Sequence, residues 1–237
     1  MGYDNQMEKR LGLLPPLVRS FVERAIPPES SPMPIGTRIN QRGEMRQKPG
    51  ARAMAFTAVQ SFDVARAGFV WRAHFPVAPG VWLDVVDACD GDEGRLEARV
   101  WGLIPFMRDA SEATAHAQAL RFLAELPWNP HAILANAGIG WTQVEDRSVE
   151  ASLPVKGSIV RLQVNFGEEG DVESVRTAAR PRKVGKTSQD TPWGGEFGDY
   201  AELGGIRIPT RGAVYWDLPE GRFTYWSGRV LTAELLR

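Results

Sequence analysis

The sequence has a single cysteine, Cys89, among its 237 residues. One thiol cannot close a disulfide framework, and it cannot supply the thiolates of a cysteine-built zinc site. No apolar run approaches the ~20 residues of a membrane span, and the N-terminus MGYDNQMEKR lacks the apolar core of roughly 7–15 residues that a signal peptide needs. The formal net charge is only −1, so no overall field attracts nucleic acid. We therefore expect a cytoplasmic protein without a membrane span or a nucleic-acid partner.

Several common motifs are also missing. The chain contains no Gly-x-Ser-x-Gly, His-Glu-x-x-His or Gly-x-Gly-x-x-Gly pattern, which are the usual marks of hydrolases, zinc proteases and dinucleotide-binding folds. The segment 184–188 ends like a phosphate-binding loop, but Arg180 stands where that motif requires glycine. The acid-rich segment 84–94 breaks the calcium-loop pattern, because glycine falls at the fifth position counted from Asp90 instead of the sixth. We expect no tightly bound cofactor and no metal.

The composition that remains is that of a soluble globular protein, with 43% hydrophobic and 24% charged residues. The length fits a single domain over residues 1–237. Pro15 and Pro16 suit the start of a helix, and an apolar stripe follows up to Ala25. A proline-rich connector then completes residues 1–34. A second helix is predicted at about 110–126, with Asp109 as its N-cap.

Elsewhere the apolar residues alternate with polar ones, as in strands that bury one face. The clearest cases are 54–59, 69–75, 95–100 and 160–166, separated by short turns rich in glycine, proline and aspartate. We predict a mainly β (α+β) fold, in which residues 35–237 form about ten antiparallel strands. A sheet of that size normally curls, so we expect a strongly curved sheet or open barrel with two main helices on its concave side.

Eight tryptophans in 237 residues suggest either core bulk or the wall of a ligand cavity. Trp71 lies in a predicted strand, and Trp193 lies in the segment 180–195, which we expect to be an irregular loop or lid. Arg72 and His74 share one face of a strand; on an inner face they could orient a substrate or exchange a proton, and on an outer face they would be solvated. The basic residues of the loop, Arg180 among them, could bind an anion or be ordinary loop charges.

Short sequence words are spaced along nearly the whole chain: Leu14–Arg19, Ala25–Pro27, Gly43–Arg46, Gly68–Ala73, Arg121–Glu125, Trp128–Pro130, Trp141, Arg180, Pro192–Trp193, Phe197, Asp199–Tyr200, Arg207–Pro209, Trp216, Tyr225–Trp226 and Gly228. These words resemble those of an uncharacterised bacterial family, a domain of unknown function. The fold that this resemblance implies is similar to that of lipoprotein carriers of the LolA/LolB type, a bent antiparallel sheet with helices in its concave side. Folds of this kind host both carriers of apolar ligands and a cofactor-free enzyme.

The resemblance directs attention to polar residues inside apolar words. Arg121 and Glu125 are spaced i, i+4, so they share one helix face. Tyr200 and Arg207 stand where the long segment rejoins the sheet. The ligand-binding candidates are Trp71, Arg72, Arg180, Trp193, Tyr200 and Arg207, and the catalytic candidates are Glu125, His74 and Tyr200.

Two functions fit these candidates. The first is a soluble protein that binds an apolar or amphipathic small molecule in a tryptophan-lined cavity. The second is a cofactor-independent enzyme, in which arginines orient a small anionic substrate while Glu125 or His74 moves protons and Tyr200 donates a hydrogen bond. The enzyme requires these groups to converge in one cleft. The sequence leaves the ligand and the oligomeric state open.

Overall fold

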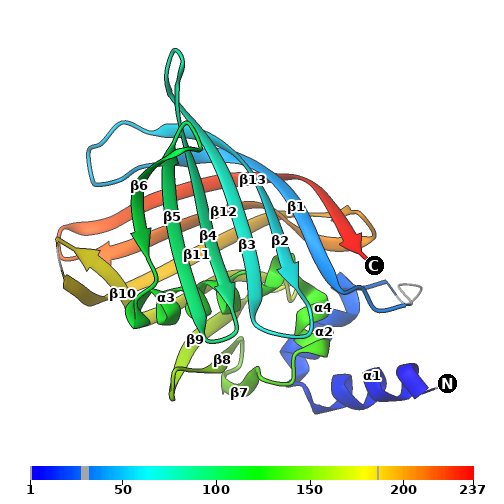
Figure 1. Ribbon diagram of the computed structural model, residues 1–237. Coiled ribbons are helices and arrows are strands. Elements are labelled where there is room, and N and C mark those ends of the chain that lie inside the picture. Colours follow the sequence, from blue (N-terminus) through cyan, green and yellow to red (C-terminus); the bar gives the residue numbers. More distant parts are fainter. Residues whose placement is uncertain (1, 28–31, 186) are drawn as a thin grey trace.

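The computed structural model describes residues 2–27, 32–185 and 187–237 (Figure 1). Within them lie thirteen strands, four α-helices and one short 3-10 helix. The helices are α1 (Gly2–Leu13), α2 (Pro16–Ala25), α3 (Glu112–Ala124) and α4 (Pro130–Ala135), with the 3-10 turn η1 (Leu126–Trp128). The strands are β1 (Gly36–Met45), β2 (Met54–Asp63), β3 (Gly68–Ala78), β4 (Val81–Asp90), β5 (Glu93–Val100), β6 (Ile104–Asp109), β7 (Gly140–Glu145), β8 (Ser148–Val155), β9 (Ser158–Phe166), β10 (Val172–Val184), β11 (Thr187–Leu203), β12 (Ile206–Leu218) and β13 (Gly221–Leu236).

The strands form one antiparallel sheet made of two meanders. Its order is β6-β5-β4-β3-β2-β1-β13-β12-β11-β10-β9-β8-β7. Consecutive strands are neighbours in the sheet except β6 and β7. In the middle β1 pairs with β13, from Gly36 opposite Leu236 to Met45 opposite Trp226. Strands β6 and β7 are the two edges, so the sheet stays unclosed over the described residues. The chain crosses from one edge to the other through α3, η1 and α4.

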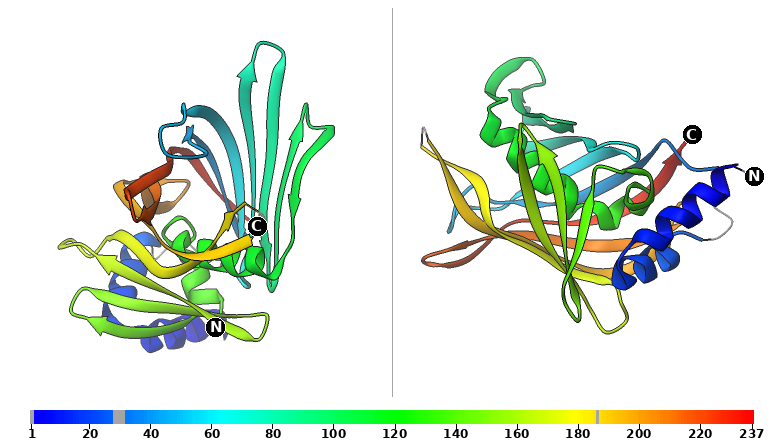
Figure 2. Two further views of the ribbon diagram at one scale, coloured as in Figure 1. Left: turned by 90° about the vertical axis from the view of Figure 1, so that its left-hand side faces the viewer. Right: turned by 90° about the horizontal axis from the view of Figure 1, so that it is seen from below.

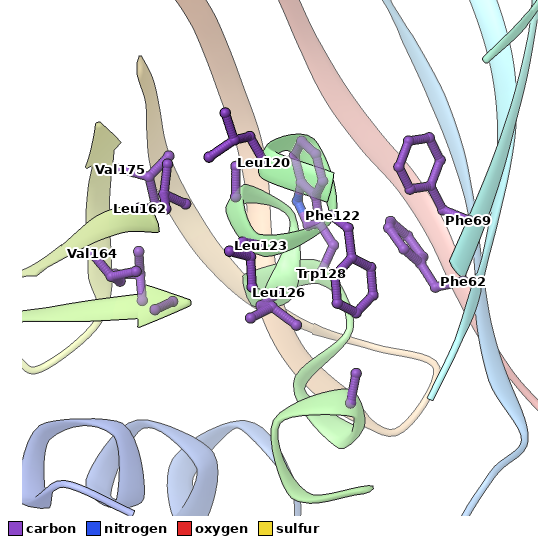
Figure 3. Packing of buried hydrophobic residues seen from close by; sticks show 14 of the residues in the cluster. Phe62, Phe69, Leu120, Phe122, Leu123, Leu126, Trp128, Leu162, Val164 and Val175 are labelled. Carbon is purple, nitrogen blue, oxygen red and sulfur yellow. The ribbon is translucent and has the colours of Figure 1, made fainter. Parts of the chain in front are cut away.

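Helix α3 fills the bend of the sheet. It packs against β4 and β5 from one meander and against β8, β9 and β10 from the other (Figure 2). Its side chains pack against both halves of the sheet, where Phe122 is 1% exposed and Leu123 is fully buried. Phe62 and Phe69 lie on one side of the helix, while Leu162, Val164 and Val175 lie on the other (Figure 3). The helix therefore joins the two halves of the sheet into one hydrophobic core.

Three glycines form a row across the middle of the sheet. Gly43 on β1 pairs with Gly228 on β13, and Gly228 pairs with Gly212 on β12. Aromatic rings cover the row, since a Cβ added at Gly228 would lie 2.8 Å from the Trp226 ring, and one at Gly212 would lie 2.9 Å from Trp128. The absence of side chains here lets the rings lie directly on the backbone where the sheet bends.

The predicted fold class is confirmed at the level of a mainly β, strongly curved antiparallel sheet. The predicted numbers of ten strands and two helices are too low. Strand periodicity is confirmed where it was clearest, with Phe69, Trp71 and Phe75 buried on one face of β3. The helix after Pro15 is α2, and α1 was missed because its sequence lacks a continuous apolar stripe. Residues 28–31 of the proline-rich connector lie outside the described residues.

Two local predictions are corrected. The N-cap of α3 is Ser111, whose side chain accepts a hydrogen bond from the Thr114 backbone, and Asp109 supports this cap by accepting from the Ser111 N–H at 3.0 Å. The segment 180–195 is no irregular loop, because apart from the turn residue Gly185 its described residues belong to the paired strands β10 and β11. Residue 186 lies outside the described residues.

Candidate functional site: a tryptophan-lined cavity

The concave side of the sheet encloses a cavity of about 780 Å³, which we call the tryptophan cavity. Strands from both meanders and one face of α3 line it. Five of the eight tryptophans contribute to its wall: Trp71, Trp128, Trp193, Trp216 and Trp226. Other apolar side chains complete the wall, among them Met45, Met54, Phe75, Leu83, Val85, Val175, Phe197 and Val214.

Register places these side chains on one face. Trp193 on β11 lies opposite Trp216 on β12. Two residues after Trp193, Gly195 lies opposite Val214, which is two residues before Trp216. Because side chains two residues apart point to the same side of a strand, both pairs face the cavity. Trp193 is only 3% exposed. It is therefore a fixed part of the wall, in place of the loop residue that we expected.

The core residue Phe56, which does not itself line the cavity, contacts two of the tryptophans that do. The ring centroid of Phe56 lies 5.6 Å from that of Trp71 and 5.8 Å from that of Trp226, and Trp128 lies 6.1 Å from Trp226. Edge-to-face and tilted contacts at these separations are favourable and hold the rings in place. The wall is thus a largely prearranged apolar surface.

A network of buried charges sits at the base of the cavity, where α3 meets β4. The Arg121 Nε donates to Glu125 Oε1 at 2.8 Å, and its Nη1 donates to Asp87 Oδ2. Each carboxylate has a second partner from an amide, since Gln60 donates to Glu125 at 2.6 Å and Gln118 donates to Asp87. The predicted Arg121–Glu125 pair is therefore present, and it is one half of a larger network.

Burial dominates the electrostatics of this network. It raises the pKa of both Asp87 and Glu125 above the ordinary carboxyl values, although Arg121 acts in the opposite direction. Burial disfavours the charge on Arg121, but the two carboxylates outweigh it and raise the pKa of the guanidinium. The Arg121 guanidinium also lies over the rings of Phe69 and Trp71, at 4.8 and 5.2 Å from their centroids.

A second buried cation, Arg180, enters the cavity from β10. Its side chain is sandwiched by tryptophans, with the guanidinium carbon 4.5 Å from the Trp193 ring centroid and 5.4 Å from that of Trp216. Its Nε and Nη2 donate to the Ala117 carbonyl of α3 at 3.3 and 3.2 Å. Of the predicted candidates, Trp71, Glu125, Arg180 and Trp193 therefore line one cavity.

Arg72 and His74 lie elsewhere. They occupy the exposed face of β3, opposite the buried face that carries Trp71. The His74 Nδ1 lies 2.8 Å from Asp84 Oδ1 on the neighbouring strand. An inward orientation was the condition for a shared role with the cavity, and the structure shows the outward one.

Tyr200 and Arg207 form a separate cluster near α2. The Tyr200 hydroxyl donates to the Val172 carbonyl at 2.9 Å, and burial raises its pKa. Arg207 binds both carboxylate oxygens of Asp171, at 2.5 and 2.7 Å, and stacks over the Tyr200 ring. Glu125, His74 and Tyr200 are thus in three different places, so the three catalytic candidates do not form one acid–base group.

Sequence reasoning missed Asp87 and Gln118. The signal for Asp87 was available, because Leu83, Val85 and Asp87 continue a period of two on β4 and all three line the cavity. In the sequence the acid-rich segment 84–94 was compared only with a calcium loop, so the inward position of Asp87 on a strand was overlooked. Gln118 carried no signal in the sequence, since it lies within the apolar face of α3.

The described residues contain no cluster of three or more histidine, cysteine, aspartate or glutamate side chains that could hold a metal ion. No helix among them has the length and apolarity to cross a bilayer.

The chain belongs to a family of unknown function, DUF6544, which matches residues 5–228. This confirms the family resemblance carried by the sequence words. No curated protein matches the chain.

Solved structures share the fold at low sequence identity. A domain described as an outer membrane lipoprotein-sorting protein from Vibrio parahaemolyticus is 9% identical, with 97% of this chain and 93% of that chain covered at a TM-score of 0.51. A LolA superfamily protein from Nitrosomonas europaea is also 9% identical, over 93% and 92% of the two chains, at a TM-score of 0.49. The expected likeness to the fold of lipoprotein carriers is therefore present, and at this identity it concerns the fold alone.

Proposed function

We propose that this protein binds an apolar or amphipathic small molecule in the tryptophan cavity. The observation that carries the proposal is the cavity itself, of about 780 Å³ and walled by five tryptophans. Sites for small molecules are usually concave and mostly apolar, with volumes of roughly 300–1,000 Å³ and a few placed polar groups. The buried network around Arg121 supplies such groups at its base.

The composition of the wall supports a flexible apolar group as part of the ligand. Met45 and Met54 stand among the rings, and their flexible thioether side chains adapt to ligands of different outline. The fold shared with the Vibrio domain agrees with a binding role, because that domain is described as a lipoprotein-sorting protein. For this chain the ligand class comes from the cavity and not from that description.

Native mass spectrometry of the protein purified from its own host, followed by denaturing extraction, tests for a bound molecule. A stoichiometric apolar or amphipathic compound would support the proposal. In parallel, the stripped protein is titrated with a fluorescent apolar probe, and we expect saturable binding at one site per chain.

A matched pair of variants locates the site. Val214→Trp places a large ring into the cavity from β12, where Val214 lines the wall. Val59→Trp makes the same change on the outer face of β2, where Val59 is 40% exposed. We expect the first variant to weaken probe binding at least about tenfold and the second to leave it unchanged. Equal binding by both variants would overturn the proposal.

A further inference from the structure

Arg180 is a buried cation without an ion-pair partner among the described residues. It is 8% exposed, and its hydrogen bonds go to a single backbone carbonyl, that of Ala117. Asp87 interacts with Arg180 only at longer range, where the guanidinium helps to lower the pKa of that carboxyl, and Asp87 is itself paired with Arg121. Arg121, which is buried in the same cavity, has two ion-pair partners. A buried charge is costly unless it is paired, and the faces of Trp193 and Trp216 compensate only part of that cost.

The unused hydrogen-bonding capacity of Arg180 lies at the cavity. Its Nε and Nη2 are occupied by the Ala117 carbonyl, whereas its Nη1 donates to no described residue. The next residue of α3, Gln118, is 4% exposed and lines the cavity, and its Oε1 has no partner. Because that oxygen is itself buried, the polar group that the cavity wall presents here is the free donor of the Arg180 cation.

The cavity wall as a whole carries a net positive charge, like Arg180 itself. Five basic and three acidic side chains line it, a formal excess of +2 in a chain whose net charge is −1. Arg182 and Lys183 follow Arg180 on β10, and Arg46 adds a charge from the end of β1. Only Lys183 of these three is paired with an acid of the wall, Asp109, at 3.2 Å. The wall thus favours an anion over a cation or a neutral group.

We propose that the ligand of the tryptophan cavity is an amphiphile with an oxyanion headgroup, and that Arg180 binds this headgroup while the apolar chain lies along the tryptophans. The inference rests on the proposed function and names the class of ligand. A guanidinium matches the geometry of carboxylate and phosphate oxygens, and hydrogen bonds between charged groups are the stronger ones. The headgroup supplies the partner that Arg180 lacks.

The test compares four ligands that share a dodecyl chain: dodecanoate, dodecyl phosphate, dodecanol and dodecyltrimethylammonium. Each is titrated calorimetrically into the stripped full-length protein, below the concentration at which it forms micelles. We expect both anions to bind at least about tenfold tighter than dodecanol, and the cation to bind more weakly than dodecanol. The ratio of the dissociation constants of dodecanoate and dodecyl phosphate shows whether the oxyanion is a carboxylate or a phosphate.

Two variants assign the preference to Arg180. Arg180→Gln keeps a donor for the Ala117 carbonyl but removes the charge, so the anions should bind no tighter than dodecanol. Arg180→Lys keeps the charge and should retain part of the preference. Arg222→Gln is the matched control, because Arg222 also stacks over an aromatic ring, that of Tyr215 at 3.6 Å, but is exposed outside the cavity. This variant should prefer the anions over dodecanol as strongly as the wild type does.

The outcomes separate this inference from the proposed function. If the wild type binds dodecanol as tightly as the anions, the oxyanion assignment is wrong while the binding function stands. If the wild type prefers the anions but Arg180→Gln retains that preference in a folded protein, Arg180 is not the residue that binds the headgroup. If none of the four ligands binds and no apolar probe binds, the proposed function fails as well. Circular dichroism of each variant verifies that the sheet has formed.

Discussion

The residues that decide the character of the site are buried charges. Arg121 is held between Asp87 and Glu125, and a glutamine amide donates a further hydrogen bond to each carboxylate. Removing one member of a buried ionic network costs more free energy of unfolding than the intact network contributes, because it leaves a buried charge without compensation. The network is therefore a feature on which stability depends as well as the polar base of the cavity.

Arg121→Met should destabilise the protein by about 3–5 kcal/mol, because both carboxylates lose their cation. The loss should be larger at pH 8 than at pH 5, since at the lower pH the carboxyl groups with raised pKa can take up protons and become neutral. Urea denaturation at the two pH values measures it. Arg38→Met is the matched control on the exposed Arg38–Glu234 pair and should cost less than about 1 kcal/mol. A loss equal to that of the control would contradict the role of the network.

His131 contributes a separate pH dependence to the stability of the fold. It is 1% exposed, neither ring nitrogen has a described partner, and burial lowers its pKa to about 4. Between pH 6.5 and 4 the unfolded chain binds a proton that the folded protein excludes, so this residue lowers stability as the pH falls through that window. The shift corresponds to about 3 kcal/mol.

His131→Leu removes this proton uptake. We expect the difference in unfolding free energy between wild type and variant to be constant above pH 7, and to change by up to about 3 kcal/mol in favour of the variant as the pH falls to 4. Chemical denaturation across that range measures the difference. A difference that stays constant down to pH 4 would show that His131 does not titrate in this way.

At the residue scale, local spacing predicted contacts that lie within one element and could not predict those between elements. The i, i+4 spacing found the Arg121–Glu125 pair, which is 2.8 Å apart. It carried no information on Asp87, which is 34 residues from Arg121. Period two showed that Arg72 and His74 share a face of β3, but the direction of that face depends on the other strands of the sheet.

At the element scale, the prolines of the segment 180–195 caused the main error in the predicted secondary structure. Prolines and charges made the segment 180–195 look irregular, yet it forms two paired strands. Pro181 lies beyond the part of β10 that pairs with β9, so its missing N–H breaks no ladder on that side. Pro192 sits beside the irregularity in register between Thr177 and Arg180. Both positions tolerate proline, and neither is visible without the pairing partners.

The glycine row gives a prediction at this scale. Gly228→Ala should destabilise the protein by about 1–3 kcal/mol, because the added Cβ would press on the Trp226 ring 2.8 Å away and distort the bend. Gly12→Ala is the control, since nothing lies within 4 Å of a Cβ there and helix α1 gains a better helix former. Thermal denaturation compares them. Equal effects of the two substitutions would mean that the glycine row is not required by close packing.

At the scale of the whole molecule, the topology joins distant parts of the chain. The strand pattern predicted meanders, because adjacent strands in each half follow one another in sequence. It could not predict that β1 pairs with β13, since that contact joins residues about 200 positions apart and local periodicity contains no information on register. The cavity depends on this pairing, because its wall takes residues from both meanders.

This arrangement predicts that the two meanders unfold together. Helix α3 packs against β4 and β5 in one half and β8 to β10 in the other, and the β1–β13 ladder joins the halves along ten residue pairs. Neither half can lose its structure without exposing the core of the other. Urea transitions followed by circular dichroism, which reports the sheet, and by tryptophan fluorescence, which reports the cavity, should therefore coincide.

Ligand binding should then shift both transitions equally. A molecule that binds only the folded cavity stabilises the protein by about 2.7 kcal/mol at a hundredfold excess over its dissociation constant. If the protein is one cooperative unit, saturating dodecanoate raises the midpoints of both signals by the same amount, and Val214→Trp reduces the shift in both to the same extent. A fluorescence midpoint that rises while the circular dichroism midpoint stays in place would instead show that the cavity and the rest of the sheet unfold separately. The single-domain prediction for residues 1–237 would then be wrong.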